Sequence, residues 1–266
     1  MKSGRRSPFR GTLYFSGALQ RSVCTLVFAW QVFEDPLVVA ANRDERLDRE
    51  SNPPAVRDWG VDVVAPTDAE AGGTWIGYNE HGVFVAITNR WVDADLAGER
   101  SRGHLVRDAL GESSAEDAAR LVESAVRDDE YQGFNLVVAD ASAALYFEWD
   151  GQLAVRNLDP GVHVVVNVGA DGDYRIPSFR QESGERQAES ADRLARDLQP
   201  EPGADVASWL DRAATAIGDH EYGVCIHGEG FGTRSSSLVV LGDERRYRYA
   251  DGPPCETAYR PVEGQV

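Results

Sequence analysis

The residues most able to do chemistry in this sequence are a cysteine, Cys24, and a short polar run, Asn42-Arg43-Asp44-Glu45. An apolar stretch rich in β-branched and aromatic side chains follows the cysteine, and another, Leu37 to Ala41, precedes the polar run. Short stretches of this kind, bounded by turn residues, are typical of buried strands. A tight antiparallel connection makes the start of one strand the neighbour of the end of the other. We therefore expect a thiol, a guanidinium and carboxylates to meet at one end of a sheet.

Several separated motifs resemble the NRDE family, the homologues of transport and Golgi organization protein 2. They are the polar run at 42–45, Glu70 to Gly77, Thr88-Asn89, and Gly232 to Ser235, in that order. The resemblance covers roughly Cys24 to Leu241. It implies an α+β fold, a four-layer αββα sandwich of two mainly antiparallel sheets, of the N-terminal nucleophile hydrolase type. It also implies a cysteine placed directly after the initiator methionine.

A second resemblance is to the hydrolases that cleave bile-salt and penicillin amides. The positions similar to their site residues, which we expect to be catalytic, are Cys24, Arg43, Asp44, Asn89, Asn167 and Arg234. In this sequence the aspartate follows the arginine directly, which leaves the role of Asp44 open, and Asn135 competes with Asn167 as the second amide. The residues that we expect beside the substrate are Asn42, Glu45, Trp75 and Ser235.

The chemistry depends on whether Cys24 is the first residue of the mature chain. A thiol has a reference pKa of about 8.5 and an α-amine one of about 7.7 to 8.0, so the amine can act as general base for its own side chain. A preceding residue would turn this nitrogen into an amide without basicity. Arg43 would favour the thiolate, Asp44 would hold the α-ammonium or Arg43, and Asn89 would donate to the oxyanion.

Residues 1–22 differ from the rest, because they hold five basic residues and no acidic one in a chain with 44 aspartates and glutamates. We interpret them as a non-native or disordered extension, and 23–266 as a single domain. An export signal is less well supported, because the apolar run from Leu13 to Leu19 is short and is interrupted by Ser16-Gly17. Val23 corresponds to a GUG start codon read as valine. Removal of that initiator would expose Cys24.

The composition limits the class of protein. A chain of 266 residues with 42% hydrophobic content can bury one large core. Its net charge of −17, with Lys2 as the only lysine, is typical of a halophilic protein kept soluble in a high-salt cytoplasm, although an acidic protein from a GC-rich genome gives the same pattern. No basic face is available to bind nucleic acid, and no apolar run is long enough to form a transmembrane helix. Three scattered cysteines indicate a reducing compartment, so we expect a cytoplasmic protein.

We predict neither a cofactor nor a metal. Cys225-Ile226-His227 is a single pair of possible ligands and Cys255 lies far along the chain, so the spacing does not predict zinc. The glycine-rich run from Gly228 to Gly232 lacks the lysine of a phosphate loop, and we interpret it as a flexible loop near the site.

The other elements must position these residues. We expect a polar loop from Arg46 to Gly60, with Asn52-Pro53-Pro54 as a lid over the site, and helices within 101–127, with Ser114 as an N-cap, and over 188–198 and 206–217. The predicted strands are 61–65, 75–78, 83–88, 134–140, 144–149, 153–157, 163–168, 222–226, 236–241 and 245–249.

Each candidate residue has a purely structural alternative. Cys24 could be a small buried hydrophobe, Arg43 and Asp44 a salt bridge, Trp75 a plug of the core, and Arg234 a helix cap. A third function, that of a plain structural or interaction protein, has little support because so many polar residues lie at predicted strand ends, so two functions compete. One is an amidohydrolase or acyltransferase that acts on a non-peptide amide or thioester of a small acylated molecule. The other, which the first resemblance implies, is a carrier or chaperone of haem or lipid-like molecules.

Overall fold

The computed structural model describes residues 24–266 and consists of two sheets covered by helices. The predictions for residues 1–22 and for Val23 as the start lie outside the described residues. Every strand pair in both sheets is antiparallel.

The first sheet is built around β1 and has the strand order β12-β11-β10-β1-β2-β13-β14-β15. Its strands are β1 (Thr25–Trp30), β2 (Leu37–Arg46), β10 (Gly161–Val166), β11 (Gly169–Ala170), β12 (Asp173–Tyr174), β13 (Phe231–Leu241), β14 (Arg246–Ala250) and β15 (Arg260–Pro261). The second sheet follows chain order from β3 to β9. Its strands are β3 (Ser51–Asp58), β4 (Asp62–Asp68), β5 (Ile76–Asn79), β6 (Phe84–Asn89), β7 (Phe134–Ala139), β8 (Ala144–Trp149) and β9 (Leu153–Asn157).

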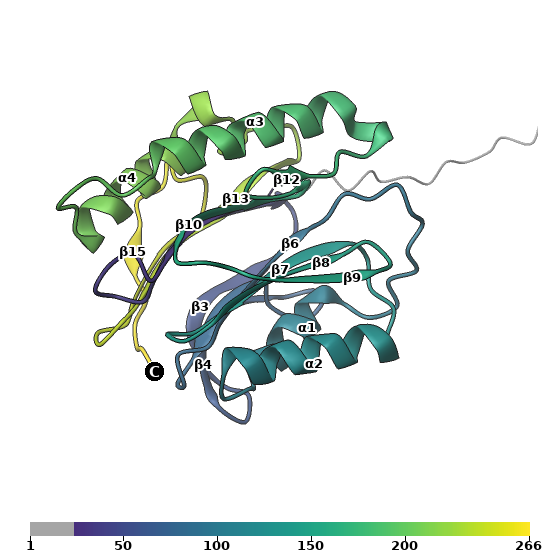
Figure 1. The fold of residues 1–266 in the computed structure, drawn as a ribbon, viewed down its shortest axis with the longest axis horizontal. Coiled ribbons are helices and arrows are strands. Elements are labelled where there is room, and N and C mark those ends of the chain that lie inside the picture. The colour runs from purple at the N-terminus through teal and green to yellow at the C-terminus, as the bar shows by residue number, and fades with distance from the viewer. Residues whose placement is uncertain (1–23) are drawn as a thin grey trace, which may run out of the picture.

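The alternation of side chains along β1 explains the layers. Leu26 and Phe28 pack between the two sheets, whereas Val27 and Ala29 face the other way, toward helices. Because successive side chains of a strand point to opposite faces, a strand of six buried residues needs a covering layer on each side. The predicted αββα sandwich is therefore confirmed, with one helix pair on the outer face of each sheet (Figure 1).

The helices are α1 (Arg102–Ala109), α2 (Ala115–Asp128), α3 (Gln181–Asp197) and α4 (Val206–Gly218), with short 3-10 turns η1 (Ser178–Arg180) and η2 (His220–Tyr222). Helices α1 and α2 pack on the second sheet, and α3 and α4 on the first. Ser114 caps α2 as predicted, because its Oγ accepts from the backbone nitrogen of Asp117 at 3.1 Å. Among residues 24–266, none of the helices combines the length and the apolar composition that crossing a membrane requires.

Three sequence predictions are wrong. The segment expected to be a lid contains β3, an edge strand in which Pro53 and Pro54 are accommodated by a register shift between Asn52 and Ala55. The strand expected over 222–226 is absent, because η2 ends at Tyr222 and an irregular segment follows. Helix α3 begins seven residues before the predicted 188, since its first turns are largely polar and carry little hydrophobic period.

Gly73 marks the place where the second sheet meets α1. A Cβ added there would lie 2.4 Å from the backbone carbonyl carbon of Gly103, and the next residue, Thr74, donates from its nitrogen to Gly103 O at 3.1 Å. The first turn of α1 therefore rests directly on the turn before β5.

We predict that Gly73→Ala lowers the free energy of unfolding by about 1–3 kcal/mol, because backbone must move to admit the methyl group. Urea denaturation measures the change. Gly161→Ala is the matched control, since its Cβ would meet nothing closer than 3.9 Å. Equal stability of the two variants would contradict this account of the contact.

Candidate active site

Cys24 lies immediately before β1, and the β1–β2 ladder sets its neighbours. Thr25 pairs with Asn42 in this ladder, so the position before β1 faces the end of β2. The Sγ atom of Cys24 lies 3.8 Å from the backbone oxygen of Asp44. The hairpin thus brings the thiol and the polar run together, at the end of the sheet where the sequence analysis expected them.

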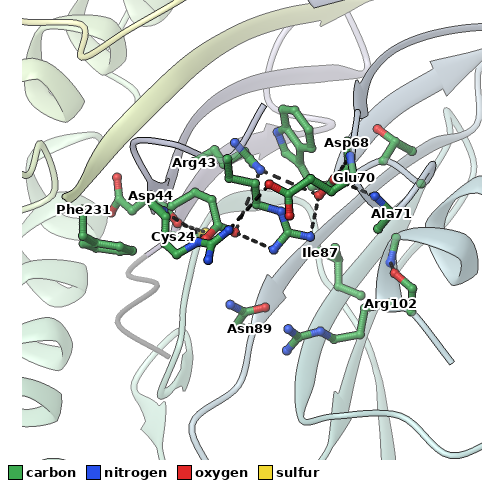
Figure 2. A pocket seen from close by; sticks show the side chains of 18 of the residues that line it. Cys24, Arg43, Asp44, Asp68, Glu70, Ala71, Ile87, Asn89, Arg102 and Phe231 are labelled. Atoms are coloured by element: carbon green, nitrogen blue, oxygen red, sulfur yellow. Dashed lines mark hydrogen bonds and ion pairs between the residues drawn. The ribbon is translucent and has the colours of Figure 1, made fainter. Parts of the chain in front are cut away.

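A cavity of about 600 Å³ opens at this end of the sandwich. Both sheets, the start of α1 and the segment before β13 contribute to its walls. Figure 2 shows Cys24, Arg43 and Asp44 on one side, with Asn89 and Arg102 facing them. Of the predicted site residues, those that line it are Cys24, Arg43, Asp44, Glu45, Trp75 and Asn89. Those outside its described lining are Asn42, Asn167, Arg234 and Ser235.

Asn167 contacts Cys24 although it does not line the cavity. Its Oδ1 accepts from the backbone nitrogen of Cys24 at 3.1 Å and from Nε2 of Gln187 at 2.9 Å, and its Nδ2 donates to the backbone oxygen of Asn89. The competing amide, Asn135, instead bonds Arg90 and Tyr146 in a separate buried network. Asn167 is therefore the amide that fixes the position of the Cys24 nitrogen.

The other three predicted residues have structural contacts. Asn42 faces the helices, and its Nδ2 donates to the backbone oxygens of Ile217 and Val224, both at 2.8 Å. Ser235 is buried in β13 and pairs with Arg43 across the ladder. Arg234 falls at the register shift of β13 and forms a 3.5 Å ion pair with Asp251. The structure thus does not bring the guanidinium of Arg234 to the thiol.

Arg43 is buried beside the thiol and only partly paired. Its guanidinium carbon lies 4.1 Å from the ring centroid of Trp75, and its ion pairs with Glu45 and Asp68 are long, at 3.9 and 4.0 Å. Burial lowers the pKa of Arg43, against the raising effect of the charges on Glu45, Cys24 and Asp68. Its Nη1 is buried and makes no hydrogen bond with the described residues. Such an atom is available to a bound anion.

Arg102, the first residue of α1, is a site residue that the sequence analysis missed. Its Nη1 donates to the backbone oxygen of Gly133 at 2.8 Å. Burial lowers its pKa to about 10, while the charge of Cys24 has a raising effect. The sequence placed a helix start here, but only the packing of Gly103 on Gly73 brings that start to Cys24.

Asp44 is fully buried at the same point. Its Oδ1 accepts from the hydroxyl of Thr233 at 2.6 Å. Burial raises the pKa of Asp44 well above its usual range, although the Thr233 hydrogen bond and the charge of Arg43 act in the opposite direction. Burial therefore opposes ionisation of this carboxyl group, and the neighbouring positive charge of Arg43 favours it.

Acidic residues and further arginines complete the walls. Arg49 forms ion pairs with Asp68 at 2.7 Å and with Glu45 at 3.3 Å. The glycine-rich run, predicted to lie near the site, contributes Glu229, Gly230 and Phe231 to the lining. The full described lining is Cys24, Arg43, Asp44, Glu45, Arg46, Arg49, Asp68, Glu70, Ala71, Gly73, Thr74, Trp75, Ile87, Asn89, Ser101, Arg102, Gly103, Glu229, Gly230 and Phe231.

Residues 23–252 match the sequence model of the family described as Transport and Golgi organisation 2. The chain belongs to this family. The resemblance drawn from the separated motifs is thus confirmed. The Transport and Golgi organization protein 2 homolog of Bos taurus is 30% identical over 229 residues, covering 77% of this chain and 82% of the relative. That of Homo sapiens is 28% identical over 236 residues, with the same coverage.

Solved structures with a similar fold include an acylase, an amidase and a hydrolase. The penicillin V acylase of Agrobacterium tumefaciens has a TM-score of 0.55 and 14% identity, covering 86% of this chain and 83% of its own. The Caenorhabditis elegans ortholog of N-acylethanolamine-hydrolyzing acid amidase has a TM-score of 0.55 and 13% identity, covering 82% and 92%. A conjugated bile acid hydrolase variant from Clostridium perfringens has a TM-score of 0.51 and 12% identity, covering 91% and 97%. These likenesses show that this family member has the N-terminal nucleophile hydrolase fold.

We predict that Arg102→Gln slows alkylation of Cys24 by iodoacetamide several-fold at neutral pH, because a nearby guanidinium favours the thiolate that reacts. Peptide mass spectrometry follows the modification of Cys24 over time. Arg107→Gln, an exposed arginine of the same helix that lies over Trp59, is the control and leaves the rate unchanged. If both variants react at the wild-type rate, Arg102 does not act on the thiol.

Proposed function

We propose that this chain is an N-terminal cysteine amidohydrolase or acyltransferase for a non-peptide amide or thioester of a small acylated molecule. One observation carries the proposal: Cys24 lines a cavity together with Arg43, Asn89 and Arg102, while Asn167 holds its backbone nitrogen at 3.1 Å. Two partly desolvated guanidinium groups would stabilise a nucleophilic thiolate, whereas a purely structural cysteine would gain nothing from them.

The mature enzyme begins at Cys24 in this proposal. Its α-amine takes the proton of its own thiol, and the thiolate attacks the carbonyl carbon of the substrate. Asn167 Oδ1 keeps the amine in place, and in this proposal the carboxylate of Asp44 accepts a hydrogen bond from the resulting ammonium or from Arg43. The ammonium then gives its proton to the leaving amine as the carbon–nitrogen bond breaks. Water, activated by the same amine, releases the acid from the thioester and restores the thiol.

Asn89 stabilises the tetrahedral intermediate in this scheme. It ends β6, faces Cys24 across the cavity, and has its backbone oxygen tied to Asn167. A side-chain amide held at a strand end is an oxyanion donor that requires little reorganisation during the reaction.

The lining favours a substrate with a polar or anionic group. Arg43 Nη1 and Arg49 Nε are buried without a hydrogen-bond partner among the described residues. A carboxylate on the acylated molecule would satisfy them, and Trp75, Ile87 and Phe231 would contact its apolar part. The amide-hydrolysing neighbours in fold suggest the compounds to try first: penicillin V, a glycine-conjugated bile acid and an N-acylethanolamine.

The proposal is tested with two forms of the protein, assayed for acid release from this panel. In one, Val23→Met is the initiator, and N-terminal sequencing is expected to find Cys24 first because methionine before a small residue is removed. In the other, an uncleavable residue precedes Cys24. We predict turnover only by the first form, and none after Cys24→Ala. Ligand binding with equal strength by both forms, without turnover, would favour the carrier alternative.

We predict that Asn89→Ala lowers kcat by about 10²–10³, the usual cost of losing one oxyanion donor, with little change in KM. Asn52→Ala is the matched control, since Asn52 is exposed on β3 and bonds only Thr67 among the described residues. Steady-state kinetics on the best substrate of the panel compare the two. An unchanged kcat in Asn89→Ala would remove Asn89 from the mechanism.

A further inference from the structure

Four metal-ligating side chains meet outside the cavity, although they are scattered along the chain. They are His220 in η2, Cys225 and His227 in the segment before β13, and Cys255 in the segment between β14 and β15. Their ligand atoms all lie within 4.8 Å of one another. The sequence spacing does not predict zinc because Cys255 is distant in the chain, but the fold brings Cys255 beside the other three side chains.

The spacing of these atoms fits a tetrahedral ion. Zinc bonds of about 2.3 Å to sulfur and about 2.0–2.1 Å to nitrogen place two sulfurs about 3.8 Å apart, and a sulfur and a nitrogen about 3.6 Å apart. The Sγ atoms of Cys225 and Cys255 are 3.5 Å apart, and Nε2 of His227 lies 3.9 Å from the sulfur of Cys225 and 3.1 Å from that of Cys255. The His220 ring packs edge-on against the His227 ring, with centroids 5.1 Å apart. Small shifts would complete the tetrahedron.

The ligand types select among metals and against a disulfide. Two thiols and two imidazoles suit zinc, whereas calcium and magnesium require oxygen ligands and iron–sulfur clusters are mostly held by four cysteines. A disulfide needs a sulfur–sulfur distance of about 2.05 Å, and both cysteines are free at 3.5 Å. Two thiolates also balance the charge of a divalent cation.

We propose that His220, Cys225, His227 and Cys255 bind one structural Zn²⁺ ion. All four ligands come from the protein, which is typical of a zinc that stabilises a fold rather than activates water. The ion would join three parts of the chain: η2, the segment before β13 and the segment after β14. Cys225 is buried and the other three ligands are exposed, so the ion can enter from solvent.

The proposed zinc is coupled to the wall of the cavity. His227 pairs with Gly232 in an isolated β-bridge, and the residues enclosed by this loop include the lining residues Glu229 and Phe231. Next to the ligand Cys225, the nitrogen of Ile226 donates to Thr233 Oγ1 at 2.8 Å, the same hydroxyl that donates to Asp44. Zinc bound at Cys225 and His227 would hold this segment in place. It would thereby position the cavity wall at Glu229 and Phe231 and the Thr233–Asp44 hydrogen bond, without contacting the substrate.

The test is metal analysis of the full chain, purified under reducing conditions without a metal-affinity step. We predict one zinc per chain by inductively coupled plasma mass spectrometry. After exchange with Co²⁺ alone, we expect the visible absorption of tetrahedral cobalt together with a thiolate-to-cobalt charge-transfer band. Cys255→Ser and His227→Gln are expected to lose stoichiometric metal. The controls Cys24→Ser and His81→Gln, which remove a thiol and an exposed imidazole elsewhere, are expected to keep it.

Three results would overturn the proposal. The first is a wild-type chain that is correctly folded by circular dichroism, binds no zinc and gives no charge-transfer band with Co²⁺; this measurement needs no variant. The second is a Cys225–Cys255 disulfide that persists in the reduced preparation. The third is loss of metal in Cys24→Ser to the same extent as in Cys255→Ser.

Discussion

The pairing of β1 with β2 is the constraint on which the rest of this structure depends. Because Thr25 pairs with Asn42, the residue before Thr25 faces the residue after Asn42. The thiol of Cys24 therefore meets the guanidinium of Arg43. A shift of one residue would turn every side chain of β2 to the opposite face. Each face of β1 packs into its own apolar cluster, with Phe28 between the sheets and Val27 under the helices, so a shifted register would have to repack both clusters. The core of the sandwich therefore fixes the geometry of the site.

Side chains also alternate along β2, so the residues of the polar run at 42–45 point to two different faces of the sheet. Arg43 and Glu45 share the face that looks into the sandwich, where they line the cavity. Asn42 points to the helices and ties the end of α4 and the following segment to β2. Burying Arg43 costs solvation energy that its long ion pairs at 3.9 and 4.0 Å offset poorly. Stability alone does not explain this arrangement, whereas the proposed role of Arg43, which is to hold positive charge beside a nucleophilic thiolate, does.

Features of the fold could be predicted from the sequence where a local pattern in the residues agrees with the long-range pairing of the strands. The β1–β2 hairpin, the N-cap at Ser114 and the αββα layers follow from periodicity, capping and the family resemblance. Arg102 could not be found this way, because its approach to Cys24 depends on the contact between Gly73 and Gly103, which joins distant parts of the chain. Arg234 is a predicted site residue that the structure places at the register shift of β13, outside the described lining of the cavity, and such a shift is invisible in the sequence. Cys255 shows the same limit, since its partners are brought to it only by the fold.

The central claim is that Cys24 is a nucleophile with a free α-amine, and trapping of the covalent intermediate tests it most directly. The mature protein is mixed with a reactive acyl amide, quenched in acid and digested with pepsin at low pH, where the protonated α-amine cannot take the acyl group from sulfur, and the peptides are analysed by mass spectrometry. We predict a peptide that begins with Cys24 and carries the acyl group as a hydroxylamine-sensitive thioester. Unmodified Cys24 in a protein that turns the amide over, or an acyl group on another residue, would contradict the account.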